Sequence, residues 1–470
     1  MKSNILEGNT NKALVSMSLP ISIGMLSTFL FQVIDTYFVG KLGPEALTAL
    51  SFSSTIYFLL VGLFIGLSVG VSIIIGKAAG AKEFNKIRQT TLVAIVLCLV
   101  LSSGFSIVGI AFTDIIFRWF GAKEAILPYI RQYIQPLFVG IPLLTVGIMA
   151  GGILRASGNI RTPEIVMGIA GIINLVFDYI LIFGKFGFPE MGIKGAAYAT
   201  VGSWAFIILA MTVLLIKDKL ISLVSAFHFK ANIAILKDIF KFGLPTTITQ
   251  VVGPLTLMFL TYLLARQSSS VVAAYGVASR IEMLISIGIL GVSTAITPFI
   301  AQNLGAQKKE RINEAIVFGG RASTYIGLAL FVVMMLFSRP IASIFSSDAT
   351  VVGYTSTYFY IVSFSYVFYG LYLITSSIFN GLQLPLNSTK IMLVKSAFFV
   401  IFTLLGSFWG VNGIFAGVAA SNILGGVYAS AEMKKEFVRT QSELAKVNVW
   451  QAYRNDFVKM GKWMTGRVTR

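Results

Sequence analysis

The sequence predicts an all-α integral membrane protein with twelve transmembrane helices, arranged as two six-helix bundles that a pseudo-two-fold axis along the membrane normal relates. Three observations predict this fold: the composition, recurring apolar segments and an internal repeat. Of the 470 residues, 56% are hydrophobic and only 12% are charged, with a mean hydropathy of +0.83. A water-soluble chain carries about twice that charged fraction. The composition therefore indicates a polytopic membrane protein.

Apolar stretches of about 20 residues recur along the whole chain, and each is long enough to cross about 30 Å of hydrocarbon as a helix. The polar N-terminal segment shows no small-residue cleavage site before the first apolar run, so we expect a retained helix there and not a signal peptide. The twelve expected helices lie at 13–38, 47–75, 90–117, 128–152, 161–183, 193–216, 238–264, 272–300, 313–337, 354–378, 387–409 and 411–432.

Positive charge in the predicted loops gathers on one side of the membrane. If both termini lie on that side, that side carries about 26 Lys and Arg and the other side about seven. Both termini are therefore expected on the cytoplasmic side of the cell's inner (plasma) membrane. The net charge of +18 then reflects topology and attraction to anionic lipid, and no nucleic-acid binding is expected. The basic tail 433–470 is expected to lie on the inner leaflet as an amphipathic helix, or alternatively to be solvated.

Cysteine and histidine are nearly absent. Cys98 and His228 each occur alone, which excludes an intrachain disulfide, a cysteine-based zinc site, a histidine-dependent triad and a multi-histidine metal site. We expect Cys98 to pack as a small apolar side chain. No reactive constellation is visible, so we expect neither an enzyme nor a resident cofactor or metal.

The chain matches itself at an offset of 225 residues, without a gap from Leu19 to Ile87, and about a fifth of positions are identical. Six helices per copy is an even number, so both copies enter the membrane in the same direction. The expected domains are an N-terminal bundle, a cytoplasmic linker, a C-terminal bundle and a tail, at 1–216, 217–237, 238–432 and 433–470. Two bundles with a cleft between them are the architecture of a transporter that opens to alternate sides.

Acidic residues within the apolar helices belong mainly to the first half. An aspartate near the bilayer centre costs about 2.5–3.5 kcal/mol on insertion scales, and both Asp35 and Asp178 are placed in predicted spans. Asn174 precedes Asp178 by four residues and therefore shares its helix face. Because burial favours the protonated form of a carboxyl group, this pair is a candidate proton site. A purely structural polar contact is the alternative.

Four further residues are candidates for motion or for a polar site. Pro20 has a repeat counterpart in Pro245, and a bend there would move Asp35; a static kink is the alternative. Glu282 is the one clear acid within the second half's spans, and Arg280 lies two residues away on a different helix face. Lys395 falls deep in a predicted helix. We expect these three charged residues to form ion pairs or to snorkel, with a place in the cleft as the alternative.

These features resemble the multidrug and toxic compound extrusion (MATE) family over about residues 10–435. The resemblance rests on the doubled twelve-helix layout and on the segments "GKAAGAKEFNKIRQ" (76–89), "AQNLGAQKKERINE" (301–314), "RASGNIRTP" (155–163) and "NLVFDYILIFG" (174–184). It implies export of cationic, lipophilic drugs in exchange for protons or sodium. It also implies that Asp35, Asn174 and Asp178 match the family's polar cluster in the N-terminal bundle, with Thr200 as its member on the sixth helix.

One departure from the family narrows the expected mechanism. Family members with a cation site in the second bundle carry acids on helices 7 and 10, whereas 243–259 and 354–378 have none here. We therefore predict a monomeric, secondary active exporter of amphipathic organic cations, coupled to protons through the N-terminal bundle by alternating access. Sodium coupling through the same acids is one alternative. A flippase for lipid-linked precursors, which the MATE family resembles in layout, is the other.

Overall fold

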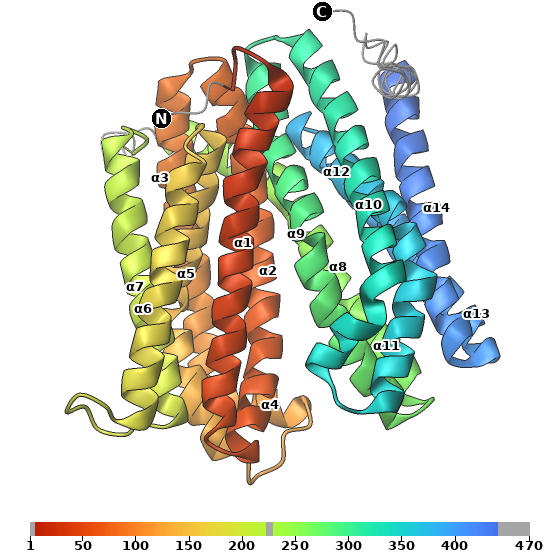
Figure 1. The fold of residues 1–470 in the computed structure, drawn as a ribbon. Helices are drawn as coiled ribbons and strands as arrows, with labels where there is room; N and C mark the ends of the chain where they lie inside the picture. Colours follow the sequence, from red (N-terminus) through yellow and green to blue (C-terminus); the bar gives the residue numbers. More distant parts are fainter. Residues whose placement is uncertain (1–4, 222–228, 440–470) are drawn as a thin grey trace, which may run out of the picture. The chain divides into compact units, whose positions relative to one another are not determined.

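The computed structural model describes residues 5–221 and 229–439, and these residues form helices joined by short loops, with no strand among them (Figure 1). Residues 440–470 of the expected tail lie outside the described part. The first seven helices are α1 (Thr10–Gly40), α2 (Pro44–Gly80), α3 (Phe84–Ala111), α4 (Thr113–Trp119), α5 (Leu127–Ala156), α6 (Arg161–Phe183) and α7 (Ile193–Lys217).

The second half of the described chain is likewise helical. Its elements are α8 (Phe229–Ala265), α9 (Ser269–Gly305), α10 (Lys309–Phe345), α11 (Ala349–Val362), η2 (Ser363–Ser365), α12 (Tyr366–Gly381), α13 (Pro385–Gly406), η3 (Ser407–Trp409) and α14 (Gly410–Arg439). Eleven stretches of the described residues are long and apolar enough to cross a membrane. The longest stretch, Pro385–Arg439, holds both α13 and α14, so the expectation of twelve spanning segments is confirmed.

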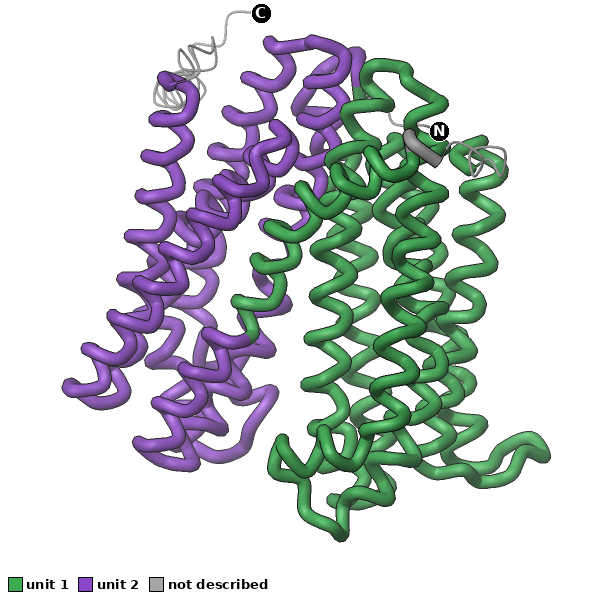
Figure 2. Tube along the Cα trace, turned by 180° about the vertical axis from the view of Figure 1, so that it is seen from behind, with its two compact units in different colours: residues 1–5, 16–254 green, residues 6–15, 255–470 purple. Residues whose placement is uncertain are grey.

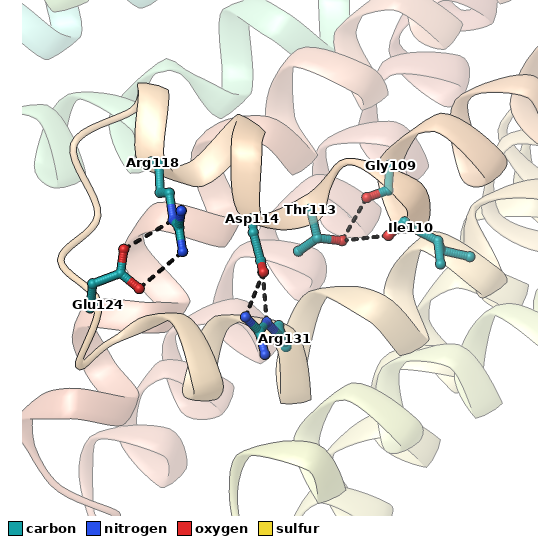
Figure 3. Close-up of polar contacts among 7 residues, drawn as sticks. All are labelled: Gly109, Ile110, Thr113, Asp114, Arg118, Glu124 and Arg131. Carbon is teal, nitrogen blue, oxygen red and sulfur yellow. Dashed lines mark hydrogen bonds and ion pairs between the residues drawn. The ribbon is translucent and has the colours of Figure 1, made fainter.

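Two expected helices are interrupted. The segment expected at 90–117 divides into α3 and α4 at Phe112, where the Thr113 hydroxyl donates to the carbonyl oxygens of Gly109 at 2.6 Å and of Ile110 at 3.2 Å (Figure 3). The segment expected at 354–378 contains the 3-10 turn η2 between α11 and α12. The hydropathy of the sequence does not predict either break.

Ion pairs fix the corner between α4 and α5. The Arg131 guanidinium donates from Nε to Asp114 Oδ1 at 2.6 Å and also contacts Oδ2, a bidentate arrangement. Arg118 and Glu124 form a second pair at 3.0 Å in Figure 3. Because the guanidinium stabilises the charged carboxylate, it lowers the pKa of Asp114 below its ordinary value.

The chain divides into two compact units, coloured separately in Figure 2. Unit 1 consists of residues 1–5 and 16–254, and unit 2 consists of residues 6–15 and 255–470. The helix α8 begins at Phe229, within the linker expected at 217–237, and its first part belongs to unit 1.

Unit 1 is organised around α5, which packs against α2, α3 and α7 and is the most buried of its helices. The first part of α8 packs closely on α2, because a Cβ atom on Gly66 would collide with the backbone of Thr247. The Thr246 hydroxyl donates to the carbonyl oxygen of Gly66 at 2.6 Å in the same contact. Cys98 of α3 is fully buried in this unit, as expected for a small apolar packing residue.

Unit 2 is organised around α12, which packs against α9, α10 and α14. The Ser293 and Ser377 hydroxyls join α9 to α12 at 2.7 Å. The start of α10 holds the N-terminal segment of this unit, since Lys308 Nζ donates to the Leu6 carbonyl at 2.6 Å and Arg311 donates to the carbonyl of Gly8.

Candidate functional site

The two predicted acids meet inside unit 1. Asp35 comes from α1 and is half-buried, and Asp178 comes from α6 and is 1% exposed. Their side chains lie close enough for the two charges to interact. Both carboxylate oxygens of Asp178, and Oδ1 of Asp35, are buried without a hydrogen-bond partner among the described residues.

A glycine explains how the helices bring the acids together. A Cβ atom on Gly171 of α6 would overlap the ring of Phe31 of α1, so the two helices approach closely only because Gly171 has no side chain. Asp35 follows Phe31 by one helical turn, and Asp178 follows Gly171 by two turns. The acids therefore extend from the same helix faces that make this contact.

The amide and hydroxyl members of the predicted cluster also meet. Asn174 of α6 donates from Nδ2 to Oγ1 of Thr200 on α7 at 3.4 Å. Asn174 lies one turn before Asp178, as its spacing predicts. All four predicted coupling residues thus belong to unit 1, with Asn174 hydrogen-bonded to Thr200 and Asp35 facing Asp178.

Two tyrosines that lie beside the acids were not among the site residues predicted from the sequence. Tyr57 of α2 interacts electrostatically with Asp35, and Tyr133 of α5 interacts with both acids. The Tyr57 ring is stacked on Trp204, with centroids 6.0 Å apart and an interplanar angle of 5°. The repeat contains a signal for Tyr133 only, because Tyr133 aligns with Tyr358 at the offset of 225, whereas Tyr57 aligns with Glu282.

This arrangement suits a small cation better than a fixed pair of charges. Among the described residues, no lysine or arginine is one of the groups that act on Asp35 or Asp178. Two neighbouring carboxylates in a poorly solvated place cannot both stay charged at low cost, so a proton or a monovalent cation between them removes the repulsion. No group of three or more His, Cys, Asp or Glu that could hold a metal ion occurs among the described residues.

Pro20 lies inside α1, which continues as one helix from Thr10 to Gly40. The proline is therefore compatible with an unbroken helix, although it removes one backbone hydrogen bond. It lies four turns before Asp35 on the same helix. A change of helix direction at Pro20 would displace that acid.

Of the three charged candidates in the second half, Glu282 and Lys395 interact with each other and Arg280 does not join them. Glu282 of α9 accepts a hydrogen bond of 2.9 Å from the Tyr358 hydroxyl, and it interacts electrostatically with Lys395 of α13. The Lys395 ammonium lies over the rings of Tyr369 and Tyr372, 5.4 Å from each centroid. Arg280 is exposed and takes no part in this cluster.

Comparison with known proteins identifies the family. A family model described as MatE matches the chain twice, over residues 20–180 and 245–405, and the two matches reproduce the offset of the internal repeat. The chain is 31% identical over 429 residues to a Shewanella oneidensis protein named "FAD transporter", covering 91% of this chain and 95% of that protein. It is 24% identical over 408 residues to the multidrug export protein MepA of Staphylococcus aureus, covering 86% and 89% of the two chains.

Solved structures agree with this family. A mutant of the MATE transporter VcmN from Vibrio cholerae superposes with a TM-score of 0.88 at 25% identity, covering 93% of this chain and 98% of that one. An outward-facing multidrug resistance MATE transporter of the MOP superfamily gives a TM-score of 0.85 at 26% identity, covering 92% and 99%. With both halves matched and its relatives covered almost from end to end, this chain belongs to the MATE family of multi-pass membrane transporters, which are not enzymes.

Proposed function

We propose that this protein is a monomeric, secondary active exporter of amphipathic organic cations, coupled to protons by alternating access, with both termini in the cytoplasm. The observation that carries the proposal is the juxtaposition of Asp35 and Asp178 in unit 1, where three of their four oxygens are buried and accept no hydrogen bond from the part of the chain that the structure describes. A cation bound by these acids removes a repulsion that the apolar surroundings would otherwise amplify.

The proposed cycle uses the acid pair as the loading site for the proton. The pair takes up a proton from the outside and releases it to the cytoplasm after the protein has changed its conformation. Asn174 and Thr200 orient the polar wall of the site through their hydrogen bond. One proton crossing about 150 mV releases about 3.5 kcal/mol, which sustains a gradient of a few hundred-fold for a neutral solute.

Sodium is the second candidate for the coupling ion. The same four side chains offer carboxylate, amide and hydroxyl oxygens, which are the ligands that hard cations prefer. Protons are the first choice because two acids facing each other need only one proton between them to become stable.

The decisive experiment uses purified protein in proteoliposomes, with pH and sodium gradients imposed separately and transport of a fluorescent cationic dye as the readout. We expect a pH gradient alone to drive transport, and Asp35→Asn and Asp178→Asn each to reduce the rate at least tenfold. Asp114→Asn, which alters an acid in α4 outside the spanning helices, is the matched control. Full transport by both variants at Asp35 and Asp178 would refute the coupling role, and drive by sodium alone would replace the proton.

A flavin nucleotide is the second candidate cargo. The observation in its favour is the Shewanella oneidensis relative named "FAD transporter", which the chain matches over 95% of that protein's length. Export assays on one expressing strain, with a cationic dye and with flavin adenine dinucleotide measured in parallel, distinguish the two. Accumulation of the dinucleotide in the medium without any change in dye resistance would favour the flavin.

A further inference from the structure

Unit 2 contains a lysine whose charge is not neutralised by an ion pair. Lys395 lies in the middle of α13, within a membrane-spanning segment. Its ammonium group makes no hydrogen bond and no ion pair with any described residue. It instead makes cation–π contacts with the rings of Tyr369, Tyr372 and Phe399. A cation at such a depth is costly, and it is typically paired or placed toward a water-filled cavity.

The side chain is held in place and does not reach for the membrane surface. A Cβ atom on Gly425 of α14 would lie 2.6 Å from Cγ of Lys395, so the aliphatic stem lies directly against that glycine. At the other end the ammonium lies 5.4 Å from the centroids of Tyr369 and Tyr372 and 5.7 Å from that of Phe399. Packing at both ends argues against simple snorkelling, which needs a free stem.

Glu282, the acid that interacts with Lys395, accepts a hydrogen bond from a different residue. Glu282 interacts electrostatically with Lys395 but forms no ion pair with it among the described residues, and its Oε2 accepts the hydrogen bond of Tyr358. The side chains of Lys395, Tyr369 and Tyr372 are each half-buried, so part of the surface of each remains uncovered by protein atoms. The ammonium therefore has three N–H donors that no described residue accepts from, beside two half-buried aromatic rings.

We propose that Lys395 anchors the anionic group of an aromatic substrate in unit 2, whose ring lies against Tyr369 and Tyr372. An anionic oxygen would accept charge-assisted hydrogen bonds from the ammonium, which are about twice as strong as neutral ones. The aromatic faces would contribute ring contacts beyond simple burial. This inference rests on the export function proposed above, but it requires neither the proton as coupling ion nor a cationic cargo.

The test compares two dyes with the same xanthene ring system and opposite charge, fluorescein as the anion and rhodamine 123 as the cation. Binding to the purified full-length protein in detergent is measured by fluorescence polarisation. We expect Lys395→Met to weaken fluorescein binding at least tenfold, Lys395→Arg to retain most of it, and Glu282→Gln to strengthen it because a nearby negative charge is removed. Arg266→Met, which removes an exposed cation of the same unit, is the matched control and should bind as the wild type does.

A second variant keeps the proposal testable if Lys395→Met does not fold. Gly425→Ala retains the charge but pushes the lysine stem away, and it should weaken fluorescein binding between twofold and tenfold. Unchanged fluorescein binding in every folded variant would overturn the proposal. So would a gain in rhodamine 123 binding by Lys395→Met without loss of fluorescein, because the lysine would then only fill an aromatic cage meant for cations.

The result is separable from the coupling proposal. Asp35→Asn and Asp178→Asn should abolish gradient-driven transport and leave fluorescein binding intact. Lys395→Met should have the opposite pattern, with weak binding of the anion and intact proton-driven transport of a cationic dye.

Discussion

The hydroxyl of Tyr358 donates a hydrogen bond of 2.9 Å to Oε2 of Glu282, so unit 2 supplies its membrane-embedded acid with a fixed donor. In unit 1, by contrast, Asp178 lies against a second acid, and neither of its oxygens has a hydrogen-bond donor among the described residues. At the repeat offset Tyr358 corresponds to Tyr133 and Glu282 to Tyr57, and both of these tyrosines lie beside the acids of unit 1. The two halves therefore share the repeat, but the first half has a phenol at position 57 where the second half has a carboxyl group at position 282.

Loss of the phenol should destabilise the second half. Tyr358→Phe leaves a buried carboxylate oxygen without its donor, and we expect a cost of about 1–3 kcal/mol in the free energy of unfolding. In combination with Glu282→Gln, the double variant should be less destabilised than the sum of the single changes, because the two residues act as a pair. The exposed Tyr360→Phe is the matched control. Strict additivity in thermal unfolding measurements would argue against the pairing.

The contact between α2 and α8 depends on a missing side chain. Gly66→Ala should destabilise the protein by about 1–3 kcal/mol, since the added Cβ atom collides with the backbone of Thr247 and cannot be accommodated by a side-chain rotation. Gly168→Ala in α6 meets no atom within 4 Å and should be neutral or slightly stabilising. A thiol-reactive fluorophore reports unfolding, because Cys98 is fully buried until the fold opens. Equal midpoints for the two variants would contradict the close contact.

Acid should weaken the corner between α4 and α5. Arg131 lowers the pKa of Asp114 from its ordinary 3.8, so their interaction stabilises the protein above that pH and is lost as the pH falls through the lowered value. Asp114→Asn should therefore unfold at a slightly lower temperature at pH 7 and lose less stability than the wild type below pH 4. The effect is small because both partners are exposed to solvent. Parallel unfolding curves at every pH would contradict this role.

Loss of the hydrogen bond between Asn174 and Thr200 should slow transport without abolishing it. Asn174→Ala is expected to slow proton-driven dye transport about three- to tenfold, which corresponds to at most about 1.4 kcal/mol, and Thr200→Val should do less because the bond is long at 3.4 Å. Thr200→Ser keeps the hydroxyl and should transport normally. If both substitutions raised the sodium concentration needed for transport, the side chains would be sodium ligands instead.

Pro20 offers a test of motion in α1. We expect Pro20→Ala to slow turnover severalfold while dye binding in detergent stays unchanged, because alanine restores the backbone hydrogen bond and resists a bend. Unaltered turnover would assign Pro20 to a static helix.

The helices could be predicted from apolar length, but their interruptions could not. The helix expected at 161–183 is found as α6 with the same bounds, since polar residues precede its largely apolar sequence and Gly184 ends it in a left-handed conformation. The break at Phe112 and the turn at Ser363–Ser365 depend on hydroxyl contacts and packing that hydropathy does not encode.

The candidate site could be predicted only in part. The spacing of Asn174 and Asp178 on one face, and their depth relative to Asp35, led to the cluster in unit 1. The tyrosines beside it come from α2 and α5, so only the packed bundle brings them near. Lys395 was expected to snorkel or to form an ion pair, whereas it is held between Gly425 and aromatic rings. To predict an ion pair, one must know which helices are neighbours in the folded protein, and the order of the helices along the sequence does not give this.

The burial of the single thiol has a practical value for studying the cycle. Because Cys98 is inaccessible in the folded protein, cysteines introduced elsewhere are expected to react selectively with spin labels or donor–acceptor dyes, without replacing the native residue. Pairs of such labels, one in each unit, would follow the opening and closing of the natural protein in real time.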